Sequence, residues 1–283
     1  FMSNLIVKVK WIKQISKEKS KGTLINEKDK PKDAQTSIVL LSKLPNDFEQ
    51  SLQQVQNFQT FLENTTFSSS SSSSSSTLSH HDSKITSVPT DLFLNTFAIS
   101  KETDDTQQRY FVSTYEPRTL KGFISSGKST NLSFSQKLEM LVALAHALCS
   151  LHSASFVHAN LNTANVHVSI GNNNRWQVRV GGMPVKYNSI GALMNNFDEQ
   201  RETYYWRAPE CFLSSSSSSS SCSPCSIDLE AMDCYSFGIL IYELIQNREP
   251  FSRLTNKQSF IETVCQKHGR PSVNATDVPT PLK

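Results

Sequence analysis

Apolar residues in the first third of the chain recur in patterns typical of short strands and one helix. Residues 5–12 alternate in part between apolar and polar, and residues 37–44 form a short β-branched and leucine run, which predicts two strands. From Phe48 to Leu62 the apolar residues recur at helical spacing, which predicts an amphipathic helix with a glutamine-rich polar face. Two further strands are expected at residues 91–99 and 109–114.

The second half of the chain has helical patterns. Ser133 followed by Gln136 is typical of a capping box and predicts the start of a helix. The apolar face expected for this helix consists of Leu138, Leu141, Val142, Ala145, Leu148 and Cys149. A second helix, over residues 229–245, is apolar on nearly all sides, which indicates burial, and it is too short to span a membrane. Strands followed by helices are the order of an α+β fold.

Three segments interrupt these elements. Two serine runs, residues 68–76 and 214–221, cannot bury apolar surface, and we interpret them as solvated insertions. Residues 13–32 are rich in lysine, but interspersed acidic residues favour a solvated loop over a basic binding patch. The chain begins at Phe1, which indicates a piece of a longer protein with flanking domains.

Composition narrows the classes of function. The 283 residues allow one large domain or two small ones, and 28 basic against 25 acidic residues predict no nucleic-acid partner. The sequence has neither an apolar run of membrane-spanning length nor a secretory signal, so we expect no membrane span and a cytoplasmic location. Cys222 and Cys225 have the spacing of half a zinc site, but no second pair matches them, so we expect reduced thiols and no metal.

Four segments of the second half follow one another in an order that is more specific than any one of them. Residues 157–166 read Val-His-Ala-Asn-Leu-Asn-Thr-Ala-Asn-Val, and residues 179–185 read Arg-Val-Gly-Gly-Met-Pro-Val. Residues 203–210 read Thr-Tyr-Tyr-Trp-Arg-Ala-Pro-Glu, and residues 233–240 read Asp-Cys-Tyr-Ser-Phe-Gly-Ile-Leu. In this order they resemble the catalytic loop, the Asp-Phe-Gly turn, the Ala-Pro-Glu segment and the buried large-lobe helix of protein kinases. The chain therefore resembles a member of the protein kinase superfamily.

The resemblance implies a two-lobed α+β fold. It divides the chain into a β-rich small lobe, residues 1–114, and a mostly helical large lobe, residues 115–283, which ends before the last helices of the family. Residues 269–283 resemble the tyrosine-kinase-like branch. The arginine that pairs with a residue like Glu210 in the family is expected beyond Lys283.

Several positions that serve phosphoryl transfer in the family carry other residues here. Asn160 replaces the catalytic aspartate, and its amide cannot act as a base near neutral pH. Gly182 replaces the aspartate that holds magnesium. Asn162 replaces the lysine of the catalytic loop, Leu41 replaces the strand lysine that grips phosphate, and Gln54 replaces its paired glutamate.

A nucleotide site is reduced to a few candidate residues. Asn165 is retained as a possible magnesium ligand, and Lys43 lies on the same strand face as Leu41. The last small-lobe strand and hinge resemble residues 109–117, which makes Ser113 the gatekeeper and Tyr115 a hinge residue. Weak ATP binding is the most that this set predicts.

Residues that serve the kinase fold are retained, in contrast to those that serve the transfer. These structural motif residues are His158, Met183, Thr203, Ala208, Pro209, Glu210, Asp233 and Gly238. We therefore interpret the chain as an inactive kinase-like domain, a pseudokinase, that binds protein partners as a scaffold or allosteric module in signalling. Two alternatives are a sensor that binds ATP weakly and a divergent kinase with residual phosphoryl transfer. Partner surfaces are expected near residues 203–207 and around residues 53–62.

Overall fold

The computed structural model describes most of the predicted elements. It covers residues 5–10, 36–43, 48–67, 90–94, 96–99, 110–171, 174–182, 184–187, 204–213, 228–254 and 256–274. The lysine-rich segment, both serine runs, Cys222, Cys225, Met183 and Thr203 lie outside these residues. The chain forms two compact units, one of residues 1–117 with 181–183 and one of residues 118–180 with 184–283, and each is described by itself.

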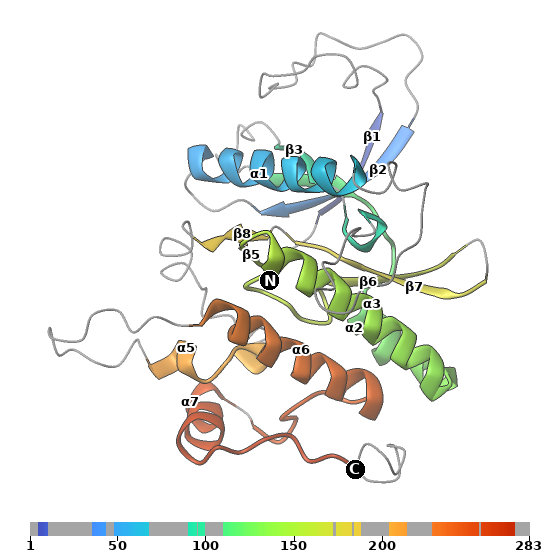
Figure 1. The fold of residues 1–283 in the computed structure, drawn as a ribbon. Coiled ribbons are helices and arrows are strands. Elements are labelled where there is room, and N and C mark those ends of the chain that lie inside the picture. Colours follow the sequence, from blue (N-terminus) through green and yellow to red (C-terminus); the bar gives the residue numbers. More distant parts are fainter. Residues whose placement is uncertain are drawn as a thin grey trace, which may run out of the picture. The chain divides into compact units, whose positions relative to one another are not determined.

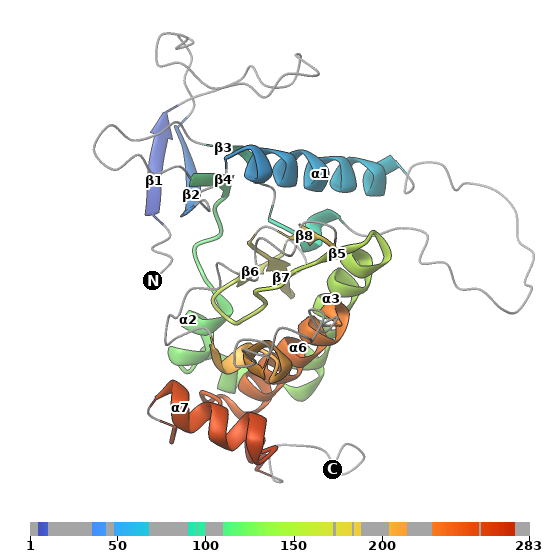
Figure 2. The same cartoon turned by 90° about the vertical axis from the view of Figure 1, so that its left-hand side faces the viewer.

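A four-stranded antiparallel sheet, in the order β1-β2-β4-β3, forms the first unit (Figure 1). Its strands are β1 Leu5–Lys10, β2 Thr36–Lys43, β3 Thr96–Ile99 and β4 Tyr110–Thr114. The strands predicted at residues 5–12, 37–44 and 109–114 are confirmed within one or two residues. The helix α1, Phe48–Phe67, lies against β3 (Figure 2).

Residues 91–99 do not form the single strand that the sequence predicts. Thr90–Leu92 is a short 3-10 turn, and only Thr96–Ile99 is strand β3. The reason lies in Phe93, whose ring packs edge-on against two α1 rings, at 5.8 Å from Phe58 and 5.9 Å from Phe61 between ring centroids. Phe93 and the next residue, Leu94, are both buried, and two consecutive buried side chains do not fit the alternation of a half-buried strand.

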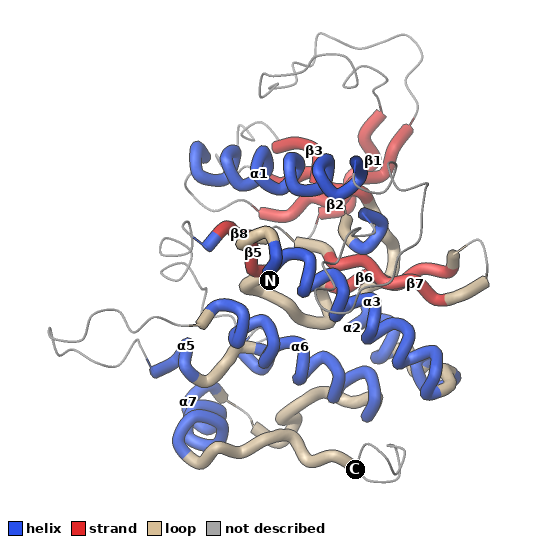
Figure 3. The backbone as a smooth tube through the Cα atoms, in the orientation of Figure 1, coloured by secondary structure: helices blue, strands red, loops and turns tan. Residues whose placement is uncertain are grey.

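The second unit is mostly helical. Its helices are α2 Leu120–Ser125, α3 Phe134–Ser153, α5 Glu210–Leu213, α6 Leu229–Gln246 and α7 Lys257–Phe260, the last continued by a π-helix, Ile261–Gln266. Short 3-10 helices lie at Lys128–Asn131 and Tyr204–Trp206. Strand β5, Phe156–Val157, pairs with β8, Val185–Lys186, and β6, Val166–Ile170, pairs with β7, Trp176–Val180, which lies against α3 (Figure 3).

The predicted start of α3 is confirmed. The backbone N–H of Gln136 donates to the Ser133 hydroxyl at 3.2 Å, and the backbone N–H of Ser133 donates to the Gln136 side-chain oxygen at 2.9 Å. These reciprocal bonds satisfy two backbone donors that a helix start otherwise leaves unpaired. The capping box is therefore formed as the sequence indicates.

The apolar face predicted for α3 is wrong at three of its six positions. Leu138 is 46% exposed and Val142 is 45% exposed, and Cys149 is exposed as well. The buried positions include Met140, Leu141, Leu144, Ala147, Leu148 and Leu151. The buried face is thus rotated from the predicted one, and only Leu141 and Leu148 of the fully buried residues belong to both.

Helices α3 and α6 pack against each other in opposite directions. Near the end of α3, His152 Nε2 lies 3.0 Å from Asp233 Oδ2 near the start of α6. Near the start of α3, the Lys137 ammonium donates to the backbone oxygen of Ile245 at 3.4 Å, near the end of α6. The helix predicted over residues 229–245 is therefore confirmed as α6, and it forms the core of the second unit with α3.

Candidate functional site

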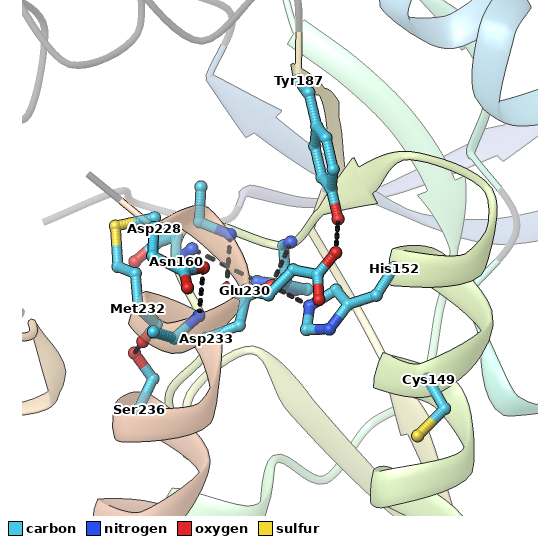
Figure 4. A network of polar contacts seen from close by, with 12 residues as sticks. Cys149, His152, Asn160, Tyr187, Asp228, Glu230, Met232, Asp233 and Ser236 are labelled. Atoms are coloured by element: carbon cyan, nitrogen blue, oxygen red, sulfur yellow. Dashed lines mark hydrogen bonds and ion pairs between the residues drawn. The ribbon is translucent and has the colours of Figure 1, made fainter. Parts of the chain in front are cut away.

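The loop between β5 and β6, residues 158–165, is anchored by the buried carboxylate of a residue of α6. Asp233, which is 1% exposed, accepts the backbone N–H of His158 at 2.7 Å and that of Ala159 at 2.9 Å (Figure 4). His152 lies at hydrogen-bond distance from the same carboxylate. A buried carboxylate is costly unless such donors surround it, so Asp233 and this loop depend on each other.

The backbone of this loop is strained at one residue. Ala159 has φ of 60°, in the left-handed region that side chains other than glycine rarely adopt. Its N–H bond to Asp233 holds it there. Ala159 stands where the kinase loop His-Arg-Asp has its arginine, and our sequence analysis did not single it out. Comparing residue 159 with the arginine of His-Arg-Asp would have shown that this positive charge is absent as well.

Three asparagines close the loop with neutral hydrogen bonds. The backbone oxygen of Asn160 accepts the side-chain amide of Asn162 at 3.0 Å and that of Asn165 at 2.8 Å. The side-chain oxygen of Asn162 accepts the backbone N–H of Ala164 at 2.9 Å and that of Asn165 at 3.1 Å. The structure therefore brings together the predicted positions Asn160, Asn162 and Asn165, and it joins them through amides in place of charged groups.

Gly182 follows the β6–β7 hairpin and offers no ligand atom from a side chain. It is exposed, and its φ of 92° lies in the region that favours glycine. It belongs to the first unit, whereas the asparagine loop belongs to the second. A carboxylate like that of the family, which would hold magnesium, is missing at this position.

Two of the degenerate positions and the candidate lysine lie in the first unit. Leu41 pairs with Val112, and Lys43 pairs with Tyr110, so both lie on the same face of β2. Gln54 lies in α1 and is 6% exposed, so it is not part of the polar glutamine face that the sequence predicts. A buried neutral amide occupies the position where the resemblance would place a glutamate.

The hinge residues predicted from the sequence lie at the end of β4. Ser113 is buried and pairs with Leu40 of β2, and Tyr115 follows the strand and is half-buried. His167, on β6 of the second unit, is also buried. Each of these residues is placed within its own unit, and Ser113 and His167 are engaged in further interactions.

The Ala-Pro-Glu segment is anchored on α6. Ala208 is fully buried in a cluster with Cys211 and Met232, and Glu210 begins α5. Just before it, the indole N–H of Trp206 donates to Glu243 at 2.7 Å, and the Ser236 hydroxyl donates to the Trp206 backbone oxygen at 2.7 Å.

Gly238, also on α6, has open space around it. Apart from its chain neighbours and the backbone of α6 itself, no atom of the described residues lies within 4 Å of where a Cβ would be. The described packing therefore does not require glycine at this position.

Glu243 is a functional candidate that our sequence analysis missed. It is 3% exposed, and burial raises its pKa to about 7 although the indole of Trp206 opposes this rise by favouring the ionised form. The available signal was a single glutamate within the otherwise apolar run of residues 239–245. A carboxyl group that changes charge near neutral pH is therefore bonded to Trp206, two residues before Ala208.

The end of β8 is joined to the start of α6 by a tyrosine. The Tyr187 hydroxyl donates to Glu230 at 2.5 Å, and Asp228 caps α6 by accepting the backbone N–H of Ala231 at 3.0 Å. Burial and the nearby carboxylates of Glu230, Asp233 and Asp228 raise the pKa of Tyr187. This acidic surrounding keeps the phenol protonated and able to donate. The bond from Tyr187 to Glu230 is drawn as a dashed line in Figure 4.

Neither a metal-binding cluster nor a membrane-spanning helix is present among the described residues. Within those residues, no three side chains of the histidine, cysteine, aspartate and glutamate types gather as a metal site would require. Among the described helices, none combines the length and the apolar character that crossing a bilayer demands.

The loop, the anchoring aspartate and the Ala-Pro-Glu segment together define a protein kinase fold, and comparison of sequences agrees. The family of protein tyrosine and serine/threonine kinases matches residues 52–280. The chain belongs to this family. It has the two-lobed α+β fold of protein kinases.

Several curated kinases are similar to parts of the chain. A probable serine/threonine-protein kinase of Dictyostelium discoideum is 26% identical over 151 residues, which are 53% of this chain and 8% of that protein. The dual specificity protein kinase shkC of the same organism is 46% identical over 44 residues, 16% of this chain and 9% of shkC. The human tyrosine-protein kinase FRK is 25% identical over 155 residues, 54% of this chain and 28% of FRK. The chain thus spans less than a third of the length of each.

Proposed function

We propose that this domain does not transfer phosphate and acts instead as a protein-binding or allosteric scaffold within a larger signalling protein. The observation that carries the proposal is the asparagine loop, where Asn160 stands in place of the catalytic base and is bonded to Asn162 and Asn165. A neutral amide has no proton affinity near pH 7, so it cannot assist the attack of a hydroxyl group.

The loss at Gly182 supports the same proposal independently. Magnesium on transferring phosphates is usually held by one or two carboxylates, and glycine at this position supplies none. Asn165 alone offers a neutral oxygen. Two separate steps of phosphoryl transfer, activation of the nucleophile and binding of the metal, would therefore both lack their charged group.

Retention of the framework argues that the domain has a use other than catalysis. Asp233 still holds the backbone of His158 and Ala159, and Ala208 is still buried beside α6. This framework presents two surfaces that we propose for protein partners in the cytoplasm. One is the neutral polar face of α1, where Gln53 donates to Asn57 at 3.0 Å. The other is the segment of residues 203–207, in which Tyr205 and Arg207 are half-buried, whereas Tyr204 and Trp206 are buried.

A second candidate function is a sensor that binds ATP weakly without using it. Asn165 favours it, because its side-chain amide bond to the Asn160 backbone fixes the orientation of an oxygen that a metal could use. Lys43 and the hinge residues Ser113 and Tyr115 are the other groups of this proposal. Residual phosphoryl transfer is the third, and it requires the missing carboxylates at both Asn160 and Gly182 to be bypassed.

Two measurements on the whole chain separate these functions. Thermal unfolding is followed with ATP, with and without magnesium, and phosphate transfer is measured in parallel with a general protein substrate. For the scaffold we expect neither a shift of the melting temperature nor transfer. A shift without transfer would replace the scaffold by the sensor.

A matched pair of variants tests whether any activity belongs to this site. Asn165→Ala removes the candidate metal ligand, and Asn131→Ala removes an exposed asparagine of the same unit outside the loop. Transfer that is lost in Asn165→Ala and kept in Asn131→Ala would refute catalytic inactivity. Transfer that both variants retain equally would come from a contaminating kinase and would leave the domain itself inactive.

A further inference from the structure

Two cysteines of the second unit are exposed on neighbouring helices. Cys149 lies on α3 and Cys234 on α6, and both are exposed and free, whereas Cys211 and Cys265 are buried. Cysteine is among the residues most often buried in proteins, and exposed thiols are open to oxidants. Two exposed thiols on helices that pack together could therefore react with the same oxidant.

Contacts around the two cysteines bring them to the same end of the helix pair. His152 lies one turn after Cys149 on α3, and positions three apart share a side of a helix. His152 contacts Asp233 at 3.0 Å, and Asp233 is the neighbour of Cys234 in the chain. Figure 4 shows Cys149 and His152 on α3 beside the helix that carries Asp233.

Electrostatics supports this proximity. The thiol of Cys149 is among the groups close enough to raise the pKa of Cys234. Burial is the largest cause of that rise, followed by Asp233, Cys149, Glu230 and Asp228. From α3, Cys149 is the group that acts on Cys234, and His152 contacts the adjacent Asp233.

We propose that Cys149 and Cys234 form a dithiol pair that oxidises to an intramolecular disulfide and joins α3 to α6. The oxidant is a small disulfide of the glutathione type. The Cys149 thiolate attacks it, a mixed disulfide forms and one small thiol leaves; the Cys234 thiolate then attacks the mixed disulfide and releases the second small thiol. The two cysteine protons end on the two released thiols, so the exchange balances.

The surroundings set the rate of this exchange. Because the thiolate is the nucleophile, the raised pKa of Cys234 makes closure of the disulfide slow near neutral pH and faster as the pH rises. At equilibrium, the fraction of linked protein follows the ratio of oxidised to reduced small thiols around it.

The position of the bond gives it a structural consequence. Asp233, next to Cys234, holds the backbone of His158 and Ala159 in the asparagine loop. A disulfide would fix the helix pair at the point where this loop is anchored. The inference does not depend on whether the domain transfers phosphate.

The test uses the whole chain with Cys222→Ser and Cys225→Ser, so that cysteines outside the described residues cannot compete. The protein is equilibrated in glutathione buffers of rising oxidised fraction at pH 8 and then digested without reduction. Cleavage after Glu230 and Glu243 separates Cys234 from the other cysteines, and mass spectrometry identifies its partner. We expect a peptide that contains Cys149 linked to one that contains Cys234.

Matched variants decide the outcome. Cys149→Ser and Cys234→Ser should each abolish the link. The linked protein should melt about 5 °C or more above the reduced protein, because the disulfide restricts the unfolded chain. Glutathione adducts on the two cysteines without a link, or a link to Cys211 or Cys265, would overturn the proposal. So would a linked protein that melts at or below the temperature of the reduced one.

Discussion

Glu243 provides the sharpest test of how the charge pattern of the second unit affects its stability. The side chain is 3% exposed and accepts a hydrogen bond from the Trp206 indole at 2.7 Å. Burial raises its pKa and the negative charge of Glu249 adds to the rise. Trp206, Thr163 and Lys121 oppose this rise of the pKa. We therefore predict that Glu243→Gln stabilises the protein at neutral and alkaline pH.

The magnitude follows from the change in proton affinity. Each tenfold change corresponds to about 1.4 kcal/mol, so a pKa that rises from the ordinary 4.5 to about 7 makes ionised Glu243 cost about 3 kcal/mol in the folded protein. Between these two values the folded protein keeps a proton that the unfolded chain has released. The free energy of unfolding therefore falls as the pH rises through this window.

Glutamine removes this dependence and keeps the oxygen that Trp206 needs. The free energy of unfolding of Glu243→Gln, relative to the native protein, should rise by about 2 to 3 kcal/mol between pH 5 and pH 8. Urea denaturation followed by circular dichroism at several pH values measures this difference. Any effect of the glutamine NH2 group on the free energy of unfolding does not depend on pH. This effect cancels, because the experiment compares the difference between the two proteins at pH 5 with that at pH 8.

A matched control is Glu139→Gln, which makes the same chemical change at an exposed position on α3 of the same unit. Its difference from the native protein should vary by less than about 0.5 kcal/mol over the same pH range. The reasoning fails if Glu243→Gln shows a constant difference from pH 5 to pH 8, or one that grows in the opposite direction.

Three further substitutions test the framework, each by urea denaturation at pH 7. Asp233→Ala leaves the backbone donors of His158 and Ala159 unpaired and should cost about 3 to 5 kcal/mol; a cost below 1 kcal/mol would contradict its anchoring role. Ser133→Ala removes the cap of α3 and should cost about 1 kcal/mol, and no loss would mean that the cap is not needed. Asn162→Ala removes two backbone bonds and should cost about 2 kcal/mol, and a neutral effect would rule out its role in the loop.

Elements whose signals are local could be predicted from the sequence. The start of α3 follows from Ser133 and Gln136 alone, because both partners of the capping box lie within one turn. The strands β1, β2 and β4 follow from short apolar runs. The asparagine loop follows from its order relative to the Ala-Pro-Glu segment and α6.

The buried face of α3 could not be predicted in this way. Apolar residues occupy nearly all positions from 140 to 151, so their spacing does not select one face. The buried face is set by the packing of α3 against β7 and against α6, which contacts α3 through His152 at one end and Lys137 at the other. Glu243 escaped prediction for the same reason, since its burial depends on Trp206, a residue 37 positions away in the chain.

The loop shows how the proposed loss of catalysis is compatible with retention of the fold. In a kinase the position of Asn162 carries a lysine that neutralises charge, and lysine has no acceptor atom. Here the Asn162 oxygen accepts two backbone N–H groups, and the residue is 5% exposed. A lysine at this position would lose both bonds and bring a charge into a buried site. Asn162 has thus become part of the framework that Asp233 anchors, so restoring an aspartate at position 160 alone would leave the loop without its cation.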